Sequence, residues 1–242
     1  MISKTRAIVL KTVNYSESSV VVKMYTKQFG LKSFLIRGVR KKHSRISASL
    51  LQPLSINEVV FINKEKNQLH IPREISSCYQ FTSISFDVIK SAQIIFMNEL
   101  VYRSVHEEET NHDLFDFLAK CITYIDRLPQ AQGNLHLVFA LHLSKFLGFC
   151  PLGNFTPQTP YFLLQEGVFS KYKTDDDLFL DQKQSELLDN FLNATLEESA
   201  KFRLSGYIRK SLLEKIILYY QLHHIGVGEI KSLEVLSEVF HL

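Results

Sequence analysis

The spacing of apolar residues changes near residue 80, from every second position to every third or fourth. Before that point, short runs rich in β-branched and aromatic residues alternate with turn residues, which is typical of a small all-β unit. We expect the first turn at residues 14–18 and a tight hairpin at Phe29-Gly30. The runs expected to form strands are RAIVLKTV, SVVVKMYT, LKSFLIRGV, LSINEVVFIN and QLHIPREI.

These runs predict a five-stranded OB-fold β-barrel over residues 1–80, because five strands in about 80 residues is the size of that Greek-key barrel. A five-stranded SH3-like barrel is the alternative that the pattern leaves open. The exposed face and loops of an OB-fold commonly bind oligonucleotides. The predicted fold therefore favours nucleic-acid binding as the function.

Residues 81–242 are predicted to form an all-α helical domain, which makes the fold class α+β and multidomain. An apolar face repeats from Ile89 to Leu100, and Asp113 is expected to cap a second helix that Pro129 stops. Residues 134–148 are apolar almost all round and predict a central helix. We also expect a loop and β-hairpin insertion at residues 150–181, and helices at residues 206–223 and 232–240.

Charge is divided unevenly between the two parts of the chain. Residues 1–80 hold 14 Lys and Arg against 4 Asp and Glu, a net charge of +10, whereas residues 81–242 hold 14 against 21, a net charge of −7. The basic part is the expected polyanion binder, and the acidic part is expected to have another task.

No apolar stretch is long enough to span a membrane, and MISKTRAIVL carries charges where a secretory signal needs its apolar segment. We therefore expect a cytoplasmic, nucleoid-associated protein without a membrane partner. Cys78, Cys121 and Cys150 are widely spaced and odd in number, so they predict buried reduced thiols rather than a disulfide framework.

The sequence does not favour an enzyme, a cofactor or a metal site, because phosphate-binding and metalloprotease motifs are missing. We interpret His223-His224 as a helix C-terminus, and the acidic runs at residues 107–109 and 175–177 as solvated turns. His136 and His142 are six residues apart, which places them on different faces of a helix.

A basic cluster carries the main functional hypothesis. Residues 37–45 contain Arg37, Arg40, Lys41, Lys42, His43 and Arg45, and the strands before them add Lys4, Arg6, Lys11, Lys23, Lys27 and Lys32. Such a surface with few acidic residues favours phosphate contact over a merely solvated loop. Tyr25 and Phe34 could stack on bases, but we interpret both as barrel core.

The chain resembles the RecO family of bacterial DNA-repair mediators. The similarity begins with TRAIVLKTVNYSESSVVVKMYTKQFG, LKSFLIRGVRKKHSR and LLQPLSINEVVF, and continues with FMNELVYRSV, the element Leu147-Gly148-Phe149 and the terminal SLEVLSEVFH. It spans most of the chain, and the order and spacing of these segments carry it rather than any single motif.

The resemblance implies binding of single- and double-stranded DNA and annealing of complementary strands. It also implies that the chain works with RecR to load RecA onto single strands coated by the single-stranded-DNA-binding protein. The DNA contacts that it implies fall on Arg6, Lys11, Lys32, Arg37, Arg40, Lys41, Lys42 and Arg45.

The resemblance further implies that the helical domain binds the acidic, Phe-ending tail of the coating protein. On this chain the tail-binding role falls on Phe139, Lys145, Phe146 and Phe149, which combine an apolar pocket with a cation for the carboxylate. Some family members bind zinc through four cysteines after the Leu-Gly-Phe element. Only Cys150 stands there in this chain, so we predict no structural zinc.

Two other functions stay open from the residues alone. An OB-fold RNA-binding module without a recombination role is the first, because contacts to the 2′-hydroxyl that separate RNA from DNA leave no sequence pattern. The second is a metal-dependent nuclease, which would need clustered carboxylates.

Overall fold

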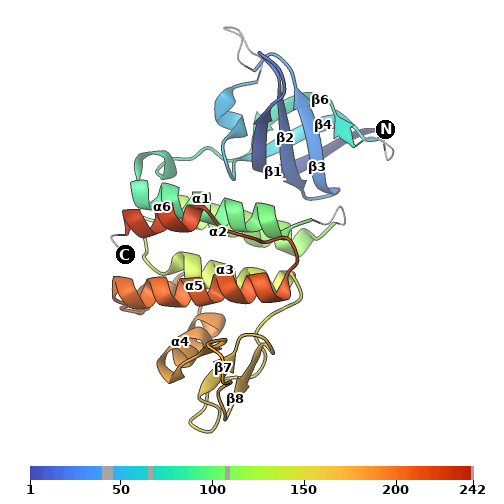
Figure 1. Ribbon diagram of the computed structural model, residues 1–242. Coiled ribbons are helices and arrows are strands. Elements are labelled where there is room, and N and C mark those ends of the chain that lie inside the picture. Colours follow the sequence, from blue (N-terminus) through green and yellow to red (C-terminus); the bar gives the residue numbers. More distant parts are fainter. Residues whose placement is uncertain (40–45, 65–67, 107–109, 241–242) are drawn as a thin grey trace. The chain divides into compact units, whose positions relative to one another are not determined.

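A computed structural model of the chain describes residues 1–39, 46–64, 68–106 and 110–240. Contacts within the chain form two compact units, Met1–Pro129 and Gln130–Leu242. The change from strands to helices near residue 80 lies inside the first unit (Figure 1). Among the described residues, none of the helices is long and apolar enough to cross a membrane.

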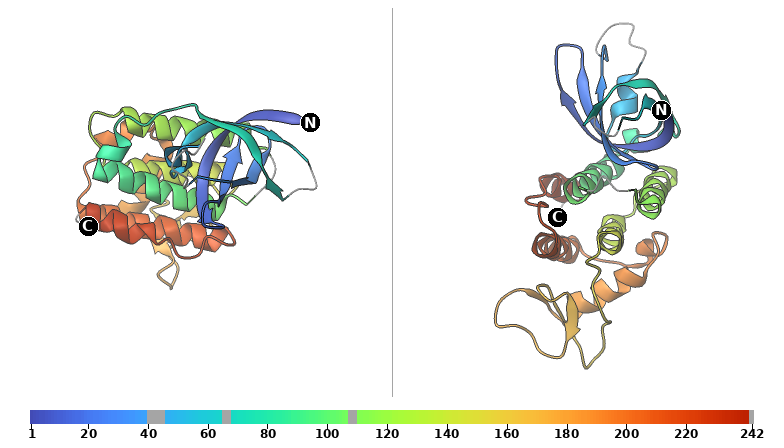
Figure 2. Two further views of the ribbon diagram at one scale, coloured as in Figure 1. Left: turned by 90° about the horizontal axis from the view of Figure 1, so that it is seen from above. Right: turned by 90° about the vertical axis from the view of Figure 1, so that its right-hand side faces the viewer.

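The first unit begins with a curled sheet in the strand order β5-β3-β2-β1-β4-β6 (Figures 1 and 2). All neighbouring strands are antiparallel except β3 and β5. The two outermost strands are consecutive in the chain and separated only by Ile71, so one segment supplies both edges of the sheet. The strands are β1 (Ile2–Asn14), β2 (Val20–Thr26), β3 (Gly30–Ile36), β4 (Ile56–Ile62), β5 (Leu69–His70) and β6 (Pro72–Ser77).

This curled, OB-fold-like sheet followed by helices confirms the predicted fold class. The fifth predicted strand is divided in two, because Pro72 has no N–H to continue a hydrogen-bond ladder. The inner face is apolar, with Phe34 fully buried and edge-on to Phe61 at 5.1 Å between ring centroids. The interpretation of Phe34 as barrel core is confirmed. Tyr25 is also buried, 1% exposed, but it lies on the outer face of β2 against Phe115 of α2, so the same interpretation is wrong for Tyr25.

Two helices of the same unit, α1 (Val88–Ser104) and α2 (His112–Arg127), pack on the outer face of the sheet. Asn98 of α1 donates a hydrogen bond to the Leu10 carbonyl at 2.9 Å, and the Tyr25 ring stacks on Phe115 of α2 at 6.5 Å. The prediction that Asp113 caps α2 is wrong. The Asn111 side chain accepts the hydrogen bond from the Leu114 amide, so the helix begins earlier.

The second unit is mainly helical, with a small sheet in the strand order β8-β7-β9. The central α3 is buried almost all round, as predicted, and accepts a 2.6 Å hydrogen bond from Tyr220 at Ala140. The predicted insertion forms the β7–β8 hairpin with a third strand, and α4 was not predicted. The elements are α3 (Leu135–Phe146), β7 (Tyr161–Leu163), β8 (Val168–Ser170), β9 (Phe179–Leu180), α4 (Gln182–Asn193), α5 (Gly206–His223) and α6 (Ser232–Val239).

A buried carboxylate near the end of α2 holds the linker between the sheet and α1. Asp126 is 1% exposed and accepts hydrogen bonds from the backbone amides of Thr82, Ser83 and Ile84 at 2.9–3.1 Å. It also accepts one from the Tyr79 hydroxyl at 2.9 Å. Burial by itself raises the pKa of Asp126, but the hydrogen bonds from Ile84, Ser83 and Thr82 outweigh burial and hold the pKa well below its usual range.

The buried Lys90 reinforces this arrangement from α1. Its ammonium group donates to the Ser83 hydroxyl at 2.7 Å and to the carbonyl of Leu128, just beyond the end of α2. The linker is therefore fixed by both helices, and every one of these partners belongs to the first unit.

We expect Asp126→Asn to lower the free energy of unfolding at pH 7 by about 2–4 kcal/mol, because several buried donors lose a charged acceptor. The effect has a defined pH dependence. A lowered pKa stabilises the fold above the ordinary Asp pKa of about 3.9, and this contribution is lost as the pH falls toward the folded-state value.

Urea unfolding of both proteins at pH 7, 5, 4 and 3 measures this difference, which should narrow below about pH 4. The exposed Glu186 gives a matched control, since Glu186→Gln should change stability by less than about 0.5 kcal/mol. Equal stability of Asp126→Asn and the wild type at pH 7 would show that this carboxylate does not hold the linker.

Candidate nucleic-acid interface

The structure places the predicted DNA-contacting residues on different parts of the sheet. Arg6 and Lys11 lie on β1, Lys32 lies on β3, and Arg37 directly follows β3. The other residues of the prediction, Arg40, Lys41, Lys42 and Arg45, lie outside the described residues.

Arg6 and Lys27 face α2 and share one carboxylate. Lys27 Nζ lies 2.6 Å from Asp116 Oδ2, and an Arg6 guanidinium nitrogen lies 3.4 Å from Asp116 Oδ1. Both cations also lie over the Phe115 ring, at 5.4 Å for Arg6 and 5.9 Å for Lys27. Lys4 is engaged as well, because Glu58 lies 2.7 Å away and raises the pKa of Lys4 through a hydrogen bond and its charge. Carboxylates within the unit therefore offset part of the positive charge of Arg6, Lys27 and Lys4.

Lys11 and Lys23 form a different arrangement on the outer face of the sheet. They are direct partners across β1 and β2, and their ammonium groups lie 4.5 and 5.6 Å from the Tyr102 ring of α1. An irregularity between Val9 and Lys11 explains the placement. Val9 pairs with Met24 on the inner face, and the extra residue after it turns Lys11 to the outer face opposite Lys23.

Two like charges directly opposite each other destabilise a sheet, and the negative face of an aromatic ring offsets only part of this repulsion. Within the described part of the chain, neither ammonium group forms an ion pair with a carboxylate. An anion placed between Lys11 and Lys23 removes the repulsion. We name this group, Lys11, Lys23 and Tyr102, the lysine pair site.

Lys32 and Arg37 are not brought to the lysine pair site. Lys32 pairs with Met24 across β2 and β3, which places its half-buried side chain on the inner side of the sheet. It lies near His70, whose pKa is lowered first by burial and then by the charge of Lys32. Arg37 is exposed beyond the end of β3. The predicted surface is therefore spread over two faces.

Three of the residues predicted to bind an acidic tail, Lys145, Phe146 and Phe149, lie around the end of α3 in the second unit, and Phe139 lies in the middle of that helix. Phe139 is fully buried, Phe146 is half-buried, and Lys145 is exposed while donating to the Leu192 carbonyl at 3.0 Å. The half-buried Phe149 ring stacks on His223, 6.2 Å between centroids at an interplanar angle of 9°. Phe139 thus supports the packing, whereas the other three residues reach the surface.

The residues considered as metal ligands form hydrogen bonds with nearby backbone groups. His223 lies in the last turn of α5, as predicted, with Nε2 2.7 Å from the Leu164 carbonyl oxygen. Asp176 accepts a hydrogen bond from the Leu178 amide in a turn. Among the described residues, no three or more His, Cys, Asp and Glu side chains could hold one metal ion.

The three cysteines differ in burial. Cys121 is buried and Cys150 is half-buried, but Cys78 is exposed, so the expectation that all three are buried is wrong for Cys78. It lies just beyond the end of β6, where the chain leaves the sheet for the linker.

Comparison with known proteins gives matches over nearly the whole chain. Residues 1–81 match the family model described as "Recombination protein O N terminal", and residues 85–234 match "Recombination protein O C terminal". A protein of Flavobacterium psychrophilum named "DNA repair protein RecO" is 36% identical over 238 residues, 98% of each chain. Proteins of the same name from Flavobacterium johnsoniae and Bacteroides fragilis are 34% and 32% identical, over at least 98% of each chain.

The lysine pair site can be tested with two charge-matched double variants. We expect Lys11→Ala/Lys23→Ala to elute from immobilised heparin at a clearly lower salt concentration than Arg6→Ala/Lys27→Ala. Both lose two positive charges, but the second pair is already engaged by Asp116. Circular dichroism checks that both variants fold. If the elution salt concentration falls equally for the two variants, or further for Arg6→Ala/Lys27→Ala, then Lys11 and Lys23 do not bind polyanions more strongly than Arg6 and Lys27.

Proposed function

The chain belongs to the Recombination protein O (RecO) family, and from this premise we propose that it is a mediator of DNA repair and homologous recombination. It binds single- and double-stranded DNA, anneals complementary strands and, with RecR, helps to load RecA onto single strands coated by the single-stranded-DNA-binding protein. In this role the chain acts by binding rather than by catalysis.

The observation that carries the proposal is the lysine pair site, to which the sequence adds a strongly basic segment at residues 37–45. Lys11 and Lys23 present two ammonium groups on one face with no carboxylate partner among the described residues. Residues 37–45 add Arg37, Arg40, Lys41, Lys42 and Arg45. Phosphates of one or two strands are the anions that such a surface attracts without regard to base sequence.

Annealing requires no reacting group, because base pairing supplies the free energy. The protein has to neutralise phosphates so that two strands approach, and it has to release the duplex afterwards. Exposed lysines and arginines suit both steps, since their contacts with phosphate are individually weak and depend on salt. Residues 81–242 have a net charge of −7, so they repel surplus DNA while remaining available to protein partners.

The tail of the coating protein is proposed to bind at the end of α3. Lys145 provides an exposed cation for a carboxylate, and Phe146 and Phe149 provide partly exposed apolar surface. Phe139, earlier on α3, is fully buried. A charge-assisted contact combined with an aromatic anchor is a common way to bind a short acidic peptide.

The DNA-binding role of the basic segment is tested with Arg40→Ala/Lys41→Ala/Lys42→Ala. We expect this variant to bind a single-stranded oligonucleotide more weakly and to anneal complementary strands more slowly. The slope of log affinity against log salt should become shallower by about 2, at about 0.7 per lost phosphate contact.

Lys171→Ala/Lys173→Ala/Lys183→Ala removes the same charge from exposed positions of the second unit and is the matched control. Unchanged affinity and slope in the Arg40/Lys41/Lys42 variant would assign the DNA contacts to other residues. A preference for RNA over DNA of the same sequence would favour an RNA-binding module.

The tail site is tested by fluorescence anisotropy with a labelled acidic peptide that ends in Phe. We expect Lys145→Glu to weaken peptide binding at least tenfold, because an attraction for the carboxylate becomes a repulsion. Lys183→Glu on α4 makes the same charge change and should have little effect. Equal weakening by both variants would indicate a general charge effect and no defined site.

A further inference from the structure

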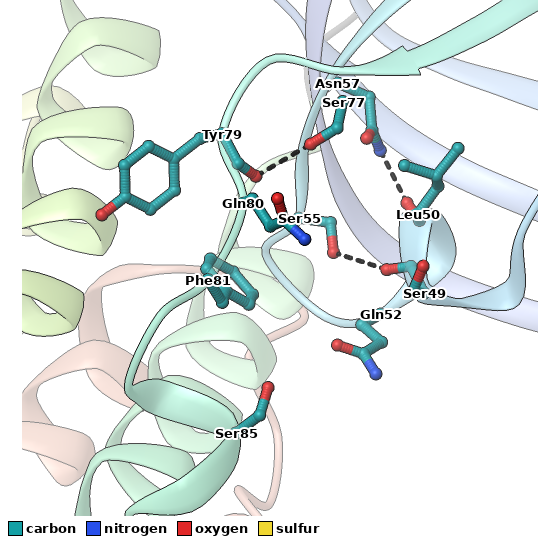
Figure 3. A pocket seen from close by; sticks show the side chains of 10 residues that line it. All are labelled: Ser49, Leu50, Gln52, Ser55, Asn57, Ser77, Tyr79, Gln80, Phe81 and Ser85. Atoms are coloured by element: carbon teal, nitrogen blue, oxygen red, sulfur yellow. Dashed lines mark hydrogen bonds between the residues drawn. The ribbon is translucent and has the colours of Figure 1, made fainter.

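The first unit contains a pocket of about 340 Å³ where β4, the turn before it and the linker to α1 meet. Figure 3 shows Gln80 and Phe81 of the linker on one side of the pocket. Asn57 of β4, Ser55 just before β4, and Gln52 below them complete the view. This volume is within the range of small-molecule sites, about 300–1,000 Å³. The lysine pair site and the basic segment do not include these side chains.

The lining is polar and carries no charged side chain. Asn57 is 1% exposed, and its Nδ2 donates to the Leu50 carbonyl at 2.6 Å. Its Oδ1 has no hydrogen-bond donor among the described residues and is open as an acceptor. Gln52 and Gln80 add amide groups that can both donate and accept. A phosphate, a carboxylate or an ammonium group would find no counter-charge here, whereas a neutral group with donors and acceptors on one edge would be satisfied.

The walls of the pocket are held in place before any ligand arrives. The Ser55 hydroxyl donates to the Ser49 carbonyl at 3.3 Å, and the Ser77 hydroxyl donates to the Tyr79 carbonyl at 3.0 Å (Figure 3). Tyr79 is in turn fixed through its own hydroxyl by Asp126. Phe81 packs edge-on against Tyr79, 6.2 Å between centroids, and stays half-buried with its ring beside the pocket. The pocket thus offers one fixed aromatic ring and several fixed polar groups.

The pocket lies next to the strand that carries the lysine pair site. The Thr12 hydroxyl donates to the Leu51 carbonyl at 3.0 Å, and Leu51 is adjacent in the chain to Leu50 of the pocket wall. Thr12 directly follows Lys11. The Val9 amide also donates to the Ser55 carbonyl at 3.0 Å. These bonds join the turn that lines the pocket to β1, the strand that carries Lys11.

We propose that the pocket accommodates one unpaired nucleobase of a bound single strand, with the base stacked on Phe81 and its edge bonded to Asn57 and the glutamine amides. A base is flat, uncharged and rich in donors and acceptors, which matches each property of the lining. The inference rests on the proposed DNA binding and adds to it a contact that duplex DNA cannot make, because paired bases are not free to enter.

The test compares a thymine oligonucleotide with an abasic strand of the same length, which has the same phosphates but no bases. Phe81→Leu keeps an apolar side chain and removes the stacking ring. We expect it to lower the preference for the thymine strand over the abasic strand roughly five- to a hundredfold, the range for one stacked base. Affinity for the abasic strand and for duplex DNA should stay unchanged, which also shows that the variant is folded.

Phe81→Tyr keeps the ring and should restore the preference. Phe86→Leu is the matched control, because Phe86 is 87% exposed on the same linker and does not line the pocket. If Phe81→Leu weakens both strands equally, or neither, the base pocket is wrong. The proposed DNA binding is judged separately by Lys11→Ala/Lys23→Ala, which should weaken binding of both strands whether or not the pocket holds a base.

Discussion

One buried carboxylate, that of Asp126, fixes the linker between the sheet and α1, and the other features of the first unit depend on it. Three consecutive backbone amides and the Tyr79 hydroxyl donate to this group, so residues 79–84 have little freedom. The α1 helix starts directly after the linker and carries Tyr102 to the lysines of the sheet. The same linker supplies Tyr79 and Phe81 to the polar pocket. The linker held by Asp126 therefore positions residues of both the lysine pair site and the polar pocket.

The basic residues of the sheet are chemically unequal although they contribute equally to net charge. Arg6 and Lys27 lie beside Asp116 and Phe115 of α2, and the Asp116 carboxylate offsets part of their charge. Lys11 and Lys23 face each other without a carboxylate among the described residues, which leaves a local excess of positive charge. This division explains how a chain with a modest net charge of +3 can present a surface for a polyanion.

The strands and most helices could be predicted from apolar spacing, because that signal is local. The α4 helix was missed although Asp181 and Gln184 have the spacing of a capping box, since the segment adjoins an irregular insertion. Lys11 was predicted as a site residue, but alternation alone places it on the inner face with Val9, and only the irregularity in β1 turns it outward. Its contact with Tyr102 joins residues 91 positions apart, and periodicity carries no information about such pairs.

The claim that the lysine pair site contacts the phosphate backbone is tested most directly by chemical acetylation of lysines, read by mass spectrometry with and without a single-stranded oligonucleotide. We expect DNA to protect Lys11 and Lys23 from acetylation, while Lys27, paired with Asp116, and Lys183 on α4 keep the same labelling. Equal labelling of Lys11 and Lys23 in the presence and absence of bound DNA, with protection found only at other lysines, would contradict it.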